Sequence, residues 1–270
     1  MISDRWLAWI INIFLILGSG YGLVVACKFG SWRLRGYRAL RLALAQRSAP
    51  LSPAPGPARI TFVCPVTRPV VLQRLLLRGL AELAERVECI CYLNRGPSAL
   101  AAAQLFNRLA PQIKTDYVAF CHQDWRPVDR DWVAKTLEVF ATQPACEMVA
   151  QIGVAADRAS LGGQIVDSHG FKGRAGVFRL HAPDEQCCVI RTHRLRELPF
   201  DEAALPEFHF WAVDYAYELQ KRGFTVWSTA ALGYHHSAIG NLNSRAFKRA
   251  RRLLRDKYGP GCVRATTGWV

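Results

Sequence analysis

The residues most suited to chemistry follow a short apolar run. Residues 117–121 have the length and the aromatic and β-branched content of a buried strand, and the run stops at His122, Gln123 and Asp124. In open α/β sheets ligands bind at the carboxyl ends of strands, because the strand fixes the backbone and the next loop supplies side chains. We therefore expect Asp124 to be functional. The alternative is a turn that only leads into a helix capped by Asp129 or Asp131.

A second candidate group follows an expected strand at residues 224–229. His235 and His236 are adjacent, and neighbouring side chains after a strand do not face the same point, so we expect at most one of them to bind a metal. One imidazole, one carboxylate and diphosphate oxygens would complete an open site for Mn²⁺ or Mg²⁺. A purely structural histidine is the alternative.

Asp214 lies inside an otherwise apolar helical stretch that Gly223 ends. A carboxylate partly buried among aromatic residues has a raised proton affinity, as a general base near neutral pH requires. The alternative is a structural carboxylate paired with Arg222 or with a backbone amide, since ion pairs also perturb carboxylates. Both interpretations remain open at this stage.

The elements that must position these groups begin at Arg59, where strands and helices alternate as in a layered α/β fold. We expect strands at residues 60–66, 87–93, 117–121, 148–154, 186–191 and 224–229, and helices at 72–85, 98–109, 132–140, 210–222 and 245–258, the last capped by Asn243 and Ser244. Residues 157–178, rich in Gly, Ser and His, are expected to form a long loop over the sheet edge. The absence of GxGxxG and Walker sequences disfavours dinucleotide binding and P-loop phosphate transfer.

The amino-terminal segment has the composition of a membrane anchor. Residues 6–27 contain no charged side chain, and this segment is long enough to cross the roughly 30 Å hydrocarbon core as a helix. Five basic residues follow within about 15 positions, so we expect a single-pass anchor in the cytoplasmic (inner) membrane with the remaining chain on the cytoplasmic side. A cleaved signal peptide would have a positive amino-terminal region and a shorter apolar core, and a lipoprotein-like box at residues 24–27 would require export of those basic residues.

The linker and the termini complete the expected organisation. Residues 31–47 alternate arginine with apolar residues, as in a basic amphipathic helix on a membrane surface or in a solvated juxtamembrane helix. Residues 48–58 contain four prolines and predict an extended spacer. We therefore divide the chain into an anchor (1–30), a basic helix and linker (31–58), a catalytic domain (59–258) and a carboxy-terminal tail (259–270).

The charge of the chain indicates which kind of partner it binds. The net charge of +14 over 270 residues favours an acidic partner such as a nucleotide diphosphate or a lipid headgroup. The final helix alone has seven basic residues, which could meet lipid phosphates, but no recognised nucleic-acid-binding motif accompanies them. The nine cysteines have no CxxC spacing, and we expect buried free thiols in a reducing compartment.

Five motifs in order resemble a known family. The motifs are Asn94 with the small-residue helix after it, the run from Tyr117 to Trp125, Asp184-Glu185, FDE at residues 200–202 with the helix around Asp214, and YHHSAIG from Tyr234. In this order they are similar to the motifs of the family 2-like glycosyltransferases of the GT-A fold. The chain is most similar to the subgroup named for the streptomycin-biosynthesis glycosyltransferase-like domain, which has HQD where most relatives have DxD. The resemblance spans roughly residues 59–258.

The resemblance implies a mixed, mainly parallel sheet flanked by helices and a nucleotide-diphospho-sugar donor. The residues that it implies near the donor are Pro65, Thr67, Asn94, His122, Gln123 and Asp124. It implies that Asp124 and one of His235 and His236 hold Mn²⁺ or Mg²⁺, and that Asp214 deprotonates the acceptor hydroxyl, with inversion at the anomeric carbon. The residues that it implies on the acceptor side are Asp184, Glu185 and His209. Because His122 replaces the usual first aspartate, it also implies weak metal affinity or a dispensable ion.

Three functions therefore remain. The first is a membrane-anchored transferase that moves a sugar onto a lipid-linked or surface-polysaccharide acceptor. The second is a catalytically inactive protein that binds nucleotide sugars. The third is a basic protein that binds a membrane surface or nucleic acid without sugar chemistry, of which the nucleic-acid role is the less expected.

Overall fold

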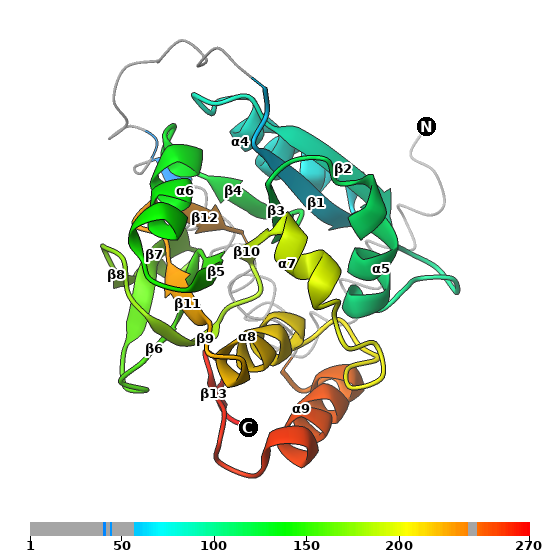
Figure 1. Ribbon diagram of the computed structural model, residues 1–270. Coiled ribbons are helices and arrows are strands. Elements are labelled where there is room, and N and C mark those ends of the chain that lie inside the picture. The colour runs from blue at the N-terminus through cyan, green and yellow to red at the C-terminus, as the bar shows by residue number, and fades with distance from the viewer. Residues whose placement is uncertain (1–39, 42–43, 45–56, 237–241) are drawn as a thin grey trace, which may run out of the picture.

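The computed structural model describes residues 40, 41, 44, 57–236 and 242–270. Its first sheet has the order β11-β5-β10-β3-β1-β2 (Figure 1). The strands are β1 (Ile60–Val66), β2 (Glu88–Leu93), β3 (Tyr117–Cys121), β5 (Cys146–Ala150), β10 (Cys187–Arg191) and β11 (Thr225–Ser228). Strand β1 is parallel to β2 and β3, β11 is parallel to β5, and β10 is antiparallel to both of its neighbours. The sheet is therefore mixed, with three of its five pairings parallel.

A second sheet has the order β4-β12-β7-β6-β9, with β8 paired to β7. Its strands are β4 (Trp125–Pro127), β6 (Ile152–Ala155), β7 (Leu161–Asp167), β8 (Gly170–Arg174), β9 (Leu180–Pro183) and β12 (Gly233–His235). The prediction of a long loop at residues 157–178 is wrong, because β7 and β8 form an antiparallel hairpin there. Gly163 and Gly173 have positive φ, and a Cβ on either would clash with backbone, so these glycines permit close pairing of strands.

Gln151 divides one apolar run into two strands. The predicted strand at 148–154 is β5 followed by β6, and the chain passes from the first sheet to the second between them. Gln151 lies at this crossing and is only 1% exposed. It accepts a hydrogen bond from Trp132 Nε1 (2.9 Å) and donates to the carbonyl oxygens of Gln164 and Ala231 (both 2.7 Å), so all its strong polar groups are paired.

The helices are close to those expected, apart from the segment predicted at 72–85 and an additional helix at Thr192–Glu197. They are α5 (Ala102–Leu109), the 3₁₀ turn η2 (Ala110–Gln112), α6 (Trp132–Thr142), α7 (Thr192–Glu197), α8 (Trp211–Lys221) and α9 (Arg245–Tyr258). The helix predicted at 72–85 instead begins with α3 (Pro69–Leu72), continues through a π-helical segment η1 (Gln73–Leu77) and ends with α4 (Arg78–Leu80). The earlier start follows from Pro69, because proline suits the first turn of a helix. Gly223 (φ +84°) follows α8, and the Ser244 hydroxyl accepts from Phe247 N–H to cap α9, as expected.

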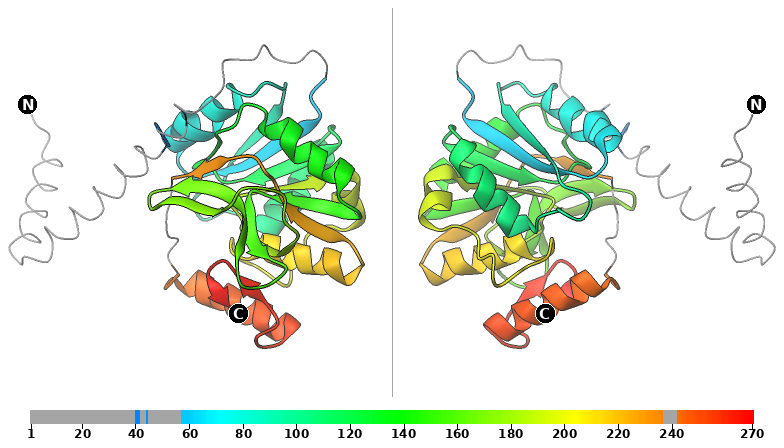
Figure 2. Two further views of the ribbon diagram at one scale, coloured as in Figure 1. Left: turned by 90° about the vertical axis from the view of Figure 1, so that its left-hand side faces the viewer. Right: turned by 90° about the vertical axis from the view of Figure 1, so that its right-hand side faces the viewer.

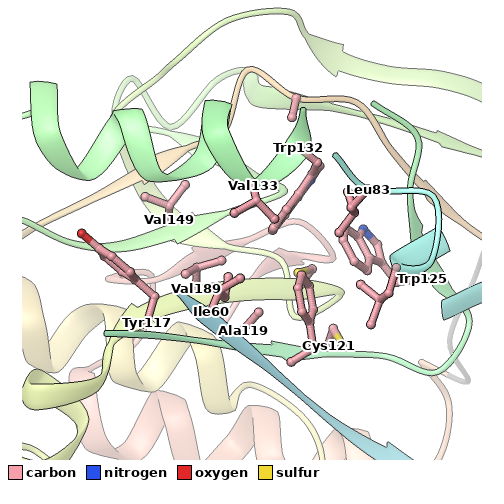
Figure 3. Packing of buried hydrophobic residues seen from close by; sticks show 14 of the residues in the cluster. Ile60, Leu83, Tyr117, Ala119, Cys121, Trp125, Trp132, Val133, Val149 and Val189 are labelled. Atoms are coloured by element: carbon pink, nitrogen blue, oxygen red, sulfur yellow. The ribbon is translucent and has the colours of Figure 1, made fainter. Parts of the chain in front are cut away.

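The core has two main apolar clusters. In one, Trp132 of α6 packs against Phe62 of β1 (5.8 Å between ring centroids) and Trp125 of β4 (5.1 Å), as the close view in Figure 3 shows for the two tryptophans. In the other, Phe106 of α5 meets Phe120 of β3 (4.2 Å) and Trp211 of α8 (4.9 Å). The residues of β3 alternate between the two clusters, so apolar side chains pack on both faces of the strand that leads to His122.

The cysteines only partly match the expectation of buried thiols. The eight in the described part of the chain are free, and five of them are buried. Cys89 and Cys91 are exposed because β2 is at the edge of its sheet, and Cys262 is exposed after α9.

The carboxy-terminal residues belong to the domain and do not form a separate tail. After α9, β13 (Arg264–Ala265) pairs with β14 (Gly268–Trp269), and Val263 and Val270 are buried in a cluster with residues of α8 and α9. Figure 2 shows α9 and this carboxy-terminal hairpin together at one end of the molecule. The predicted boundary at residue 258 therefore cuts through a packed unit.

Little of the predicted amino-terminal region is described. Leu40, Arg41 and Leu44 are helical, and Leu40 is buried in a cluster with Leu75, Val128 and Tyr234. At least this part of the expected basic helix therefore packs on the domain. The expected anchor at residues 6–27 lies outside the described residues, and none of the helices among the residues described is long and apolar enough to cross a membrane.

Candidate functional site

The loop His122-Gln123-Asp124 is a tight connection between the two sheets. It follows β3, whose five residues are all buried, and β4 begins immediately after it at Trp125. His122 N–H donates to the Gln186 carbonyl (2.9 Å), and Trp125 N–H donates to the His122 carbonyl (3.1 Å). Both ends of the loop are thus fixed by backbone hydrogen bonds, so its side chains have defined positions.

The register of β12 brings His235 to this loop. Strand β12 is antiparallel to β4 with His235 opposite Trp125, and His236 N–H donates to the Asp124 carbonyl (3.0 Å). The His235 imidazole therefore lies on the same side as the Asp124 carboxylate. The His236 ring is elsewhere, with Nδ1 2.8 Å from the Tyr234 hydroxyl.

His122, Asp124 and His235 form a compact triad. His235 Nε2 lies 3.3 Å from Asp124 Oδ1 and 3.4 Å from His122 Nδ1, and His122 Nδ1 lies 4.0 Å from Asp124 Oδ1. One ligand atom from each residue falls within 4.8 Å of the others, the spacing of a candidate metal site. Two imidazole nitrogens and a carboxylate oxygen suit Mn²⁺ and, less well, Mg²⁺, which prefers oxygen ligands.

The electrostatics of the triad favour a cation. Burial raises the pKa of Asp124, but the charge and hydrogen bond of His235 and the charge of His122 outweigh it and hold that pKa well below its usual range. Burial lowers the pKa of His235, but Asp124 reverses the effect and raises it. Burial lowers the pKa of His122, which keeps this imidazole neutral and able to bind a metal.

Gln123 joins the loop of the candidate metal site to the end of β1. Its Oε1 accepts from the backbone N–H groups of Thr67 (3.0 Å) and Arg68 (2.7 Å), and its Nε2 donates to Thr67 Oγ1 (2.7 Å). The side chain of Gln123 therefore connects the ends of two neighbouring parallel strands, where a nucleotide would be expected in this type of sheet.

A cavity of about 560 Å³ opens beside the triad. It brings together the three predicted acceptor-side residues Asp184, Glu185 and His209 with His122, Asp124 and His235. The other predicted donor residues do not line it. Thr67 is exposed beside Gln123 and Pro65 is partly exposed on β1, whereas Asn94 is buried and exchanges two hydrogen bonds with the backbone of Leu100, in the loop before α5.

Other cavity residues were missed by sequence reasoning. Asp167 and Lys172, an ion pair on the β7–β8 hairpin, line the cavity, as do Thr266 and Thr267 near the carboxy terminus. Asp167 ends β7, so the strand-end argument that selected Asp124 would also have selected Asp167 had this segment been interpreted as a strand.

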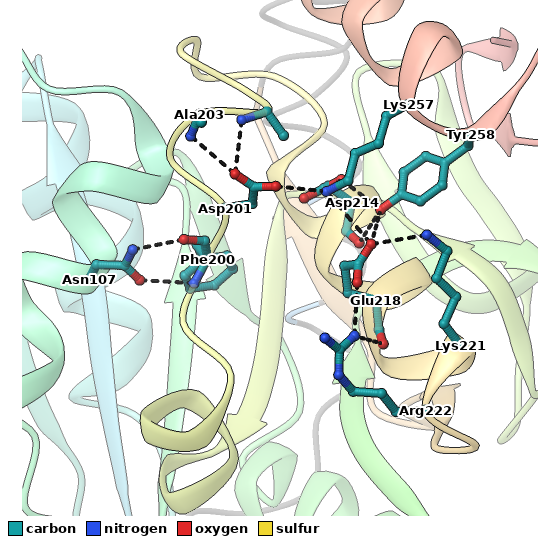
Figure 4. Close-up of polar contacts among 11 residues, drawn as sticks. Asn107, Phe200, Asp201, Ala203, Asp214, Glu218, Lys221, Arg222, Lys257 and Tyr258 are labelled. Carbon is teal, nitrogen blue, oxygen red and sulfur yellow. Dashed lines mark hydrogen bonds and ion pairs between the residues drawn. The ribbon is translucent and has the colours of Figure 1, made fainter.

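Asp214 does not line this cavity. It is 4% exposed on α8, and its Oδ1 accepts from Lys257 Nζ (2.8 Å) and Tyr258 Oη (2.7 Å) of α9 (Figure 4). Burial raises the Asp214 pKa, and these two partners only partly offset it. The arrangement is the structural ion pair of the alternative interpretation, but with Lys257 in place of Arg222, which binds Glu218 instead (2.8 Å).

Comparison with known proteins places the fold. The chain matches no protein-family model and no curated protein. Its fold is that of the GT-A glycosyltransferases, a mixed α/β sheet flanked by helices. The crystal structure of GalNAc-T7 with UDP, GalNAc and Mn²⁺ is similar over 75% of this chain, with a TM-score of 0.54 and 8% sequence identity.

The likeness concerns the fold and not the whole neighbouring protein. This chain spans about half of the GalNAc-T7 chain, with 50% of it covered. A mannosyltransferase, PcManGT from Pyrobaculum calidifontis in complex with GDP-Man and Mn²⁺, is similar over 86% of this chain and 70% of its own, with a TM-score of 0.48 and 13% identity. The closer resemblance to the streptomycin-type subgroup stays a prediction.

Proposed function

We propose that this protein is a glycosyltransferase that moves a sugar from a nucleotide-diphospho-sugar to an acceptor hydroxyl. The observation that supports it best is the triad of His122, Asp124 and His235 beside a 560 Å³ cavity in a GT-A fold. Two imidazoles and a carboxylate from the ends of two strands are a donor set suited to a divalent ion.

Three side chains would hold the ion, namely His122, Asp124 and His235. A bound divalent ion supplies positive charge that offsets the charge of the leaving diphosphate. The Asp124 carboxylate lies 3.3 Å from His235 Nε2, so both can face one ion, and Gln123 keeps the loop in register with β1. Because the triad contains a single carboxylate, we expect its metal affinity to be weaker than that of a site with two.

Lys172 adds a positive charge to the lining of the cavity. Its ammonium forms an ion pair with the buried Asp167, so the lysine is held on the hairpin β7–β8 and faces the cavity. Lysine binds phosphate as a point charge. We infer that Lys172 contacts the diphosphate of the donor, with Asp167 as the residue that positions it.

The acceptor in this proposal is lipid-linked or a surface polysaccharide. The support is the uncharged segment at residues 6–27 with basic residues after it, and the basic surface of α9. Phe247 of α9 and Leu242 before it line the cavity, while Arg245, Lys248 and Arg252 of the same helix are exposed. A helix that borders the cavity and presents cations to solvent suits an acceptor held at an anionic membrane surface. The proposal places the protein at the cytoplasmic membrane as a single-pass protein with its catalytic domain inside the cell.

A donor screen tests the proposed function. The full chain in detergent is incubated with UDP-, GDP- and dTDP-sugars, with and without Mn²⁺, and both thermal stabilisation and nucleotide release are measured for wild type, Asp124→Ala and the exposed control Asp256→Ala. Stabilisation and release by one donor, lost in Asp124→Ala and kept in Asp256→Ala, would support a transferase. Binding without release would favour an inactive nucleotide-sugar-binding protein, and binding of no donor would contradict the proposal.

A further inference from the structure

The turn between β9 and β10 lies directly against the metal-binding loop. This turn consists of Asp184, Glu185 and Gln186, and the Gln186 carbonyl accepts the backbone hydrogen bond of His122 (2.9 Å). Glu185 lines the same cavity as the triad. A carboxylate on this turn therefore has a fixed position relative to the residues proposed to hold the donor.

The four carboxylates that line the cavity have different partners. Asp124 is in the triad, Asp167 is paired with Lys172, and Asp184 accepts from Thr266 Oγ1 (2.7 Å). Glu185 differs from these three, because its Oε1 is buried and has no hydrogen-bond partner among the described residues. A buried oxygen without a partner is costly unless a ligand or water completes it.

The surroundings of Glu185 favour a carboxylate that takes up a proton readily. Burial and the charge of Asp184 raise its pKa well above the usual range, although the backbone N–H groups of Phe210, Trp211 and Ala212 at the start of α8 act in the opposite direction. The other ionisable groups of the cavity are the triad, Asp167, Lys172 and His209. The same α8 amides stabilise the charged form that the carboxylate takes once it has lost its proton.

We propose that Glu185 is the general base of the glycosyl transfer, an inference that rests on the proposed function. Glu185 removes the proton of the acceptor hydroxyl as the hydroxyl oxygen forms a bond to the anomeric carbon of the donor sugar. The bond from that carbon to the diphosphate oxygen breaks, and the leaving diphosphate takes the electron pair. Attack from the face opposite the leaving group inverts the anomeric configuration. Asp214 lies outside the cavity and holds α8 to α9.

The test compares two glutamate-to-glutamine variants of the full chain. Glu185→Gln removes the base with little change of shape, and Glu138→Gln makes the same charge change at an exposed position of α6. Each is assayed with UDP-GalNAc and with GDP-mannose in Mn²⁺, with water as the acceptor, by nucleotide release across pH and by NMR of the anomer first formed. Affinity for UDP, GDP and dTDP is measured separately.

We expect Glu185→Gln to keep nucleotide affinity within about twofold and to lose about 10²- to 10⁴-fold in release rate, the usual contribution of a general base. In wild type and Glu138→Gln the rate should rise with pH as the base loses its proton, and the first anomer should be inverted. The conservative Glu185→Asp should keep the pH dependence at a lower rate.

The outcomes separate this inference from the proposed function. Release by Glu185→Gln within a few-fold of wild type, retention of configuration, or nucleotide binding with no release by wild type at any pH would each overturn the assignment of the base. In the first two cases the wild-type protein still releases nucleotide, so the proposed transferase function would stand without Glu185 as its base. If wild type binds none of UDP, GDP and dTDP, the proposed function fails and the base with it.

Discussion

His122 Nδ1 and His235 Nε2 lie 3.4 Å apart, although 113 positions separate the two residues in the chain. At this distance two protonated imidazoles would repel each other, whereas two neutral nitrogens can share a proton or bind one cation. Asp124 beside them adds a negative charge. The pair therefore has the spacing of two ligands of one ion.

We expect His235→Ala to abolish the thermal stabilisation that Mn²⁺ gives to the wild-type protein. His236→Ala is the matched control, because the His236 ring lies against the Tyr234 hydroxyl and not in the triad. Differential scanning fluorimetry across Mn²⁺ concentrations measures both. Equal loss of Mn²⁺ stabilisation in the two variants would contradict the assignment of His235 as the ligand.

Gln123→Met should weaken UDP binding in Mn²⁺ by about tenfold, because three hydrogen bonds that connect the metal loop to β1 are lost. Thr67→Val removes one of these three bonds and should have a smaller effect. Isothermal titration calorimetry measures the affinities. A larger loss in Thr67→Val would show that Thr67 contacts the nucleotide directly and that the connection through Gln123 matters less.

Gln151→Leu should lower the free energy of unfolding by about 3 kcal/mol, since it leaves Trp132 Nε1 and two carbonyl oxygens without their partners in the interior. Gln143→Leu, at the carboxyl end of α6, should change it by less than about 0.5 kcal/mol. Urea denaturation provides the measurement. Similar values for the two variants would mean that the junction between the sheets does not depend on this amide.

Stability should depend on pH through His181 of β9. Burial, with a smaller effect of Arg158, lowers the pKa of this histidine from 6.5 to about 4. The unfolded chain therefore takes up a proton below about pH 6.5 that the folded state accepts only near pH 4, so this contribution to stability is present above pH 6.5 and is lost as the pH falls to 4. His181→Gln should reduce that slope in denaturant unfolding, and the exposed His193→Gln should not.

Asp214→Asn should cost about 2 kcal/mol of stability, less than for a fully buried ion pair because Lys257 is 23% exposed. A double-mutant cycle with Lys257→Met should give a coupling energy above about 0.5 kcal/mol, as expected for residues in contact. The cycle with Arg222→Met should give a smaller value, because Arg222 binds Glu218. Stronger coupling to Arg222 would contradict this arrangement.

Local patterns in the sequence were sufficient to predict much of the first sheet. The apolar runs of β1, β3 and β10 are short and end in polar residues, so their positions followed from the sequence, and the prediction that Asp124 is functional rested on its position after the end of β3. The same patterns failed at residues 157–178, because the glycines that allow β7 and β8 to pair closely are also typical of loops. Because that hairpin was not predicted, the cavity residues Asp167 and Lys172 were not predicted either.

Other features depend on contacts between distant segments. The choice of His235 over His236 follows from the pairing of β12 with β4, which sequence periodicity did not reveal. Asp214 appeared suited to base chemistry because its helix is apolar, but Lys257 and Tyr258 come from α9, 43 and 44 positions away. Glu185 was predicted only as an acceptor-side residue, since its closeness to the start of α8 depends on the folded chain.

The long separation between the two ligand segments has a consequence for synthesis. A nascent chain that has left the ribosome only as far as α8 contains the loop His122-Gln123-Asp124 but not His235. An ion that needs all three side chains of the triad can therefore bind only after β12 has been synthesised and has paired with β4.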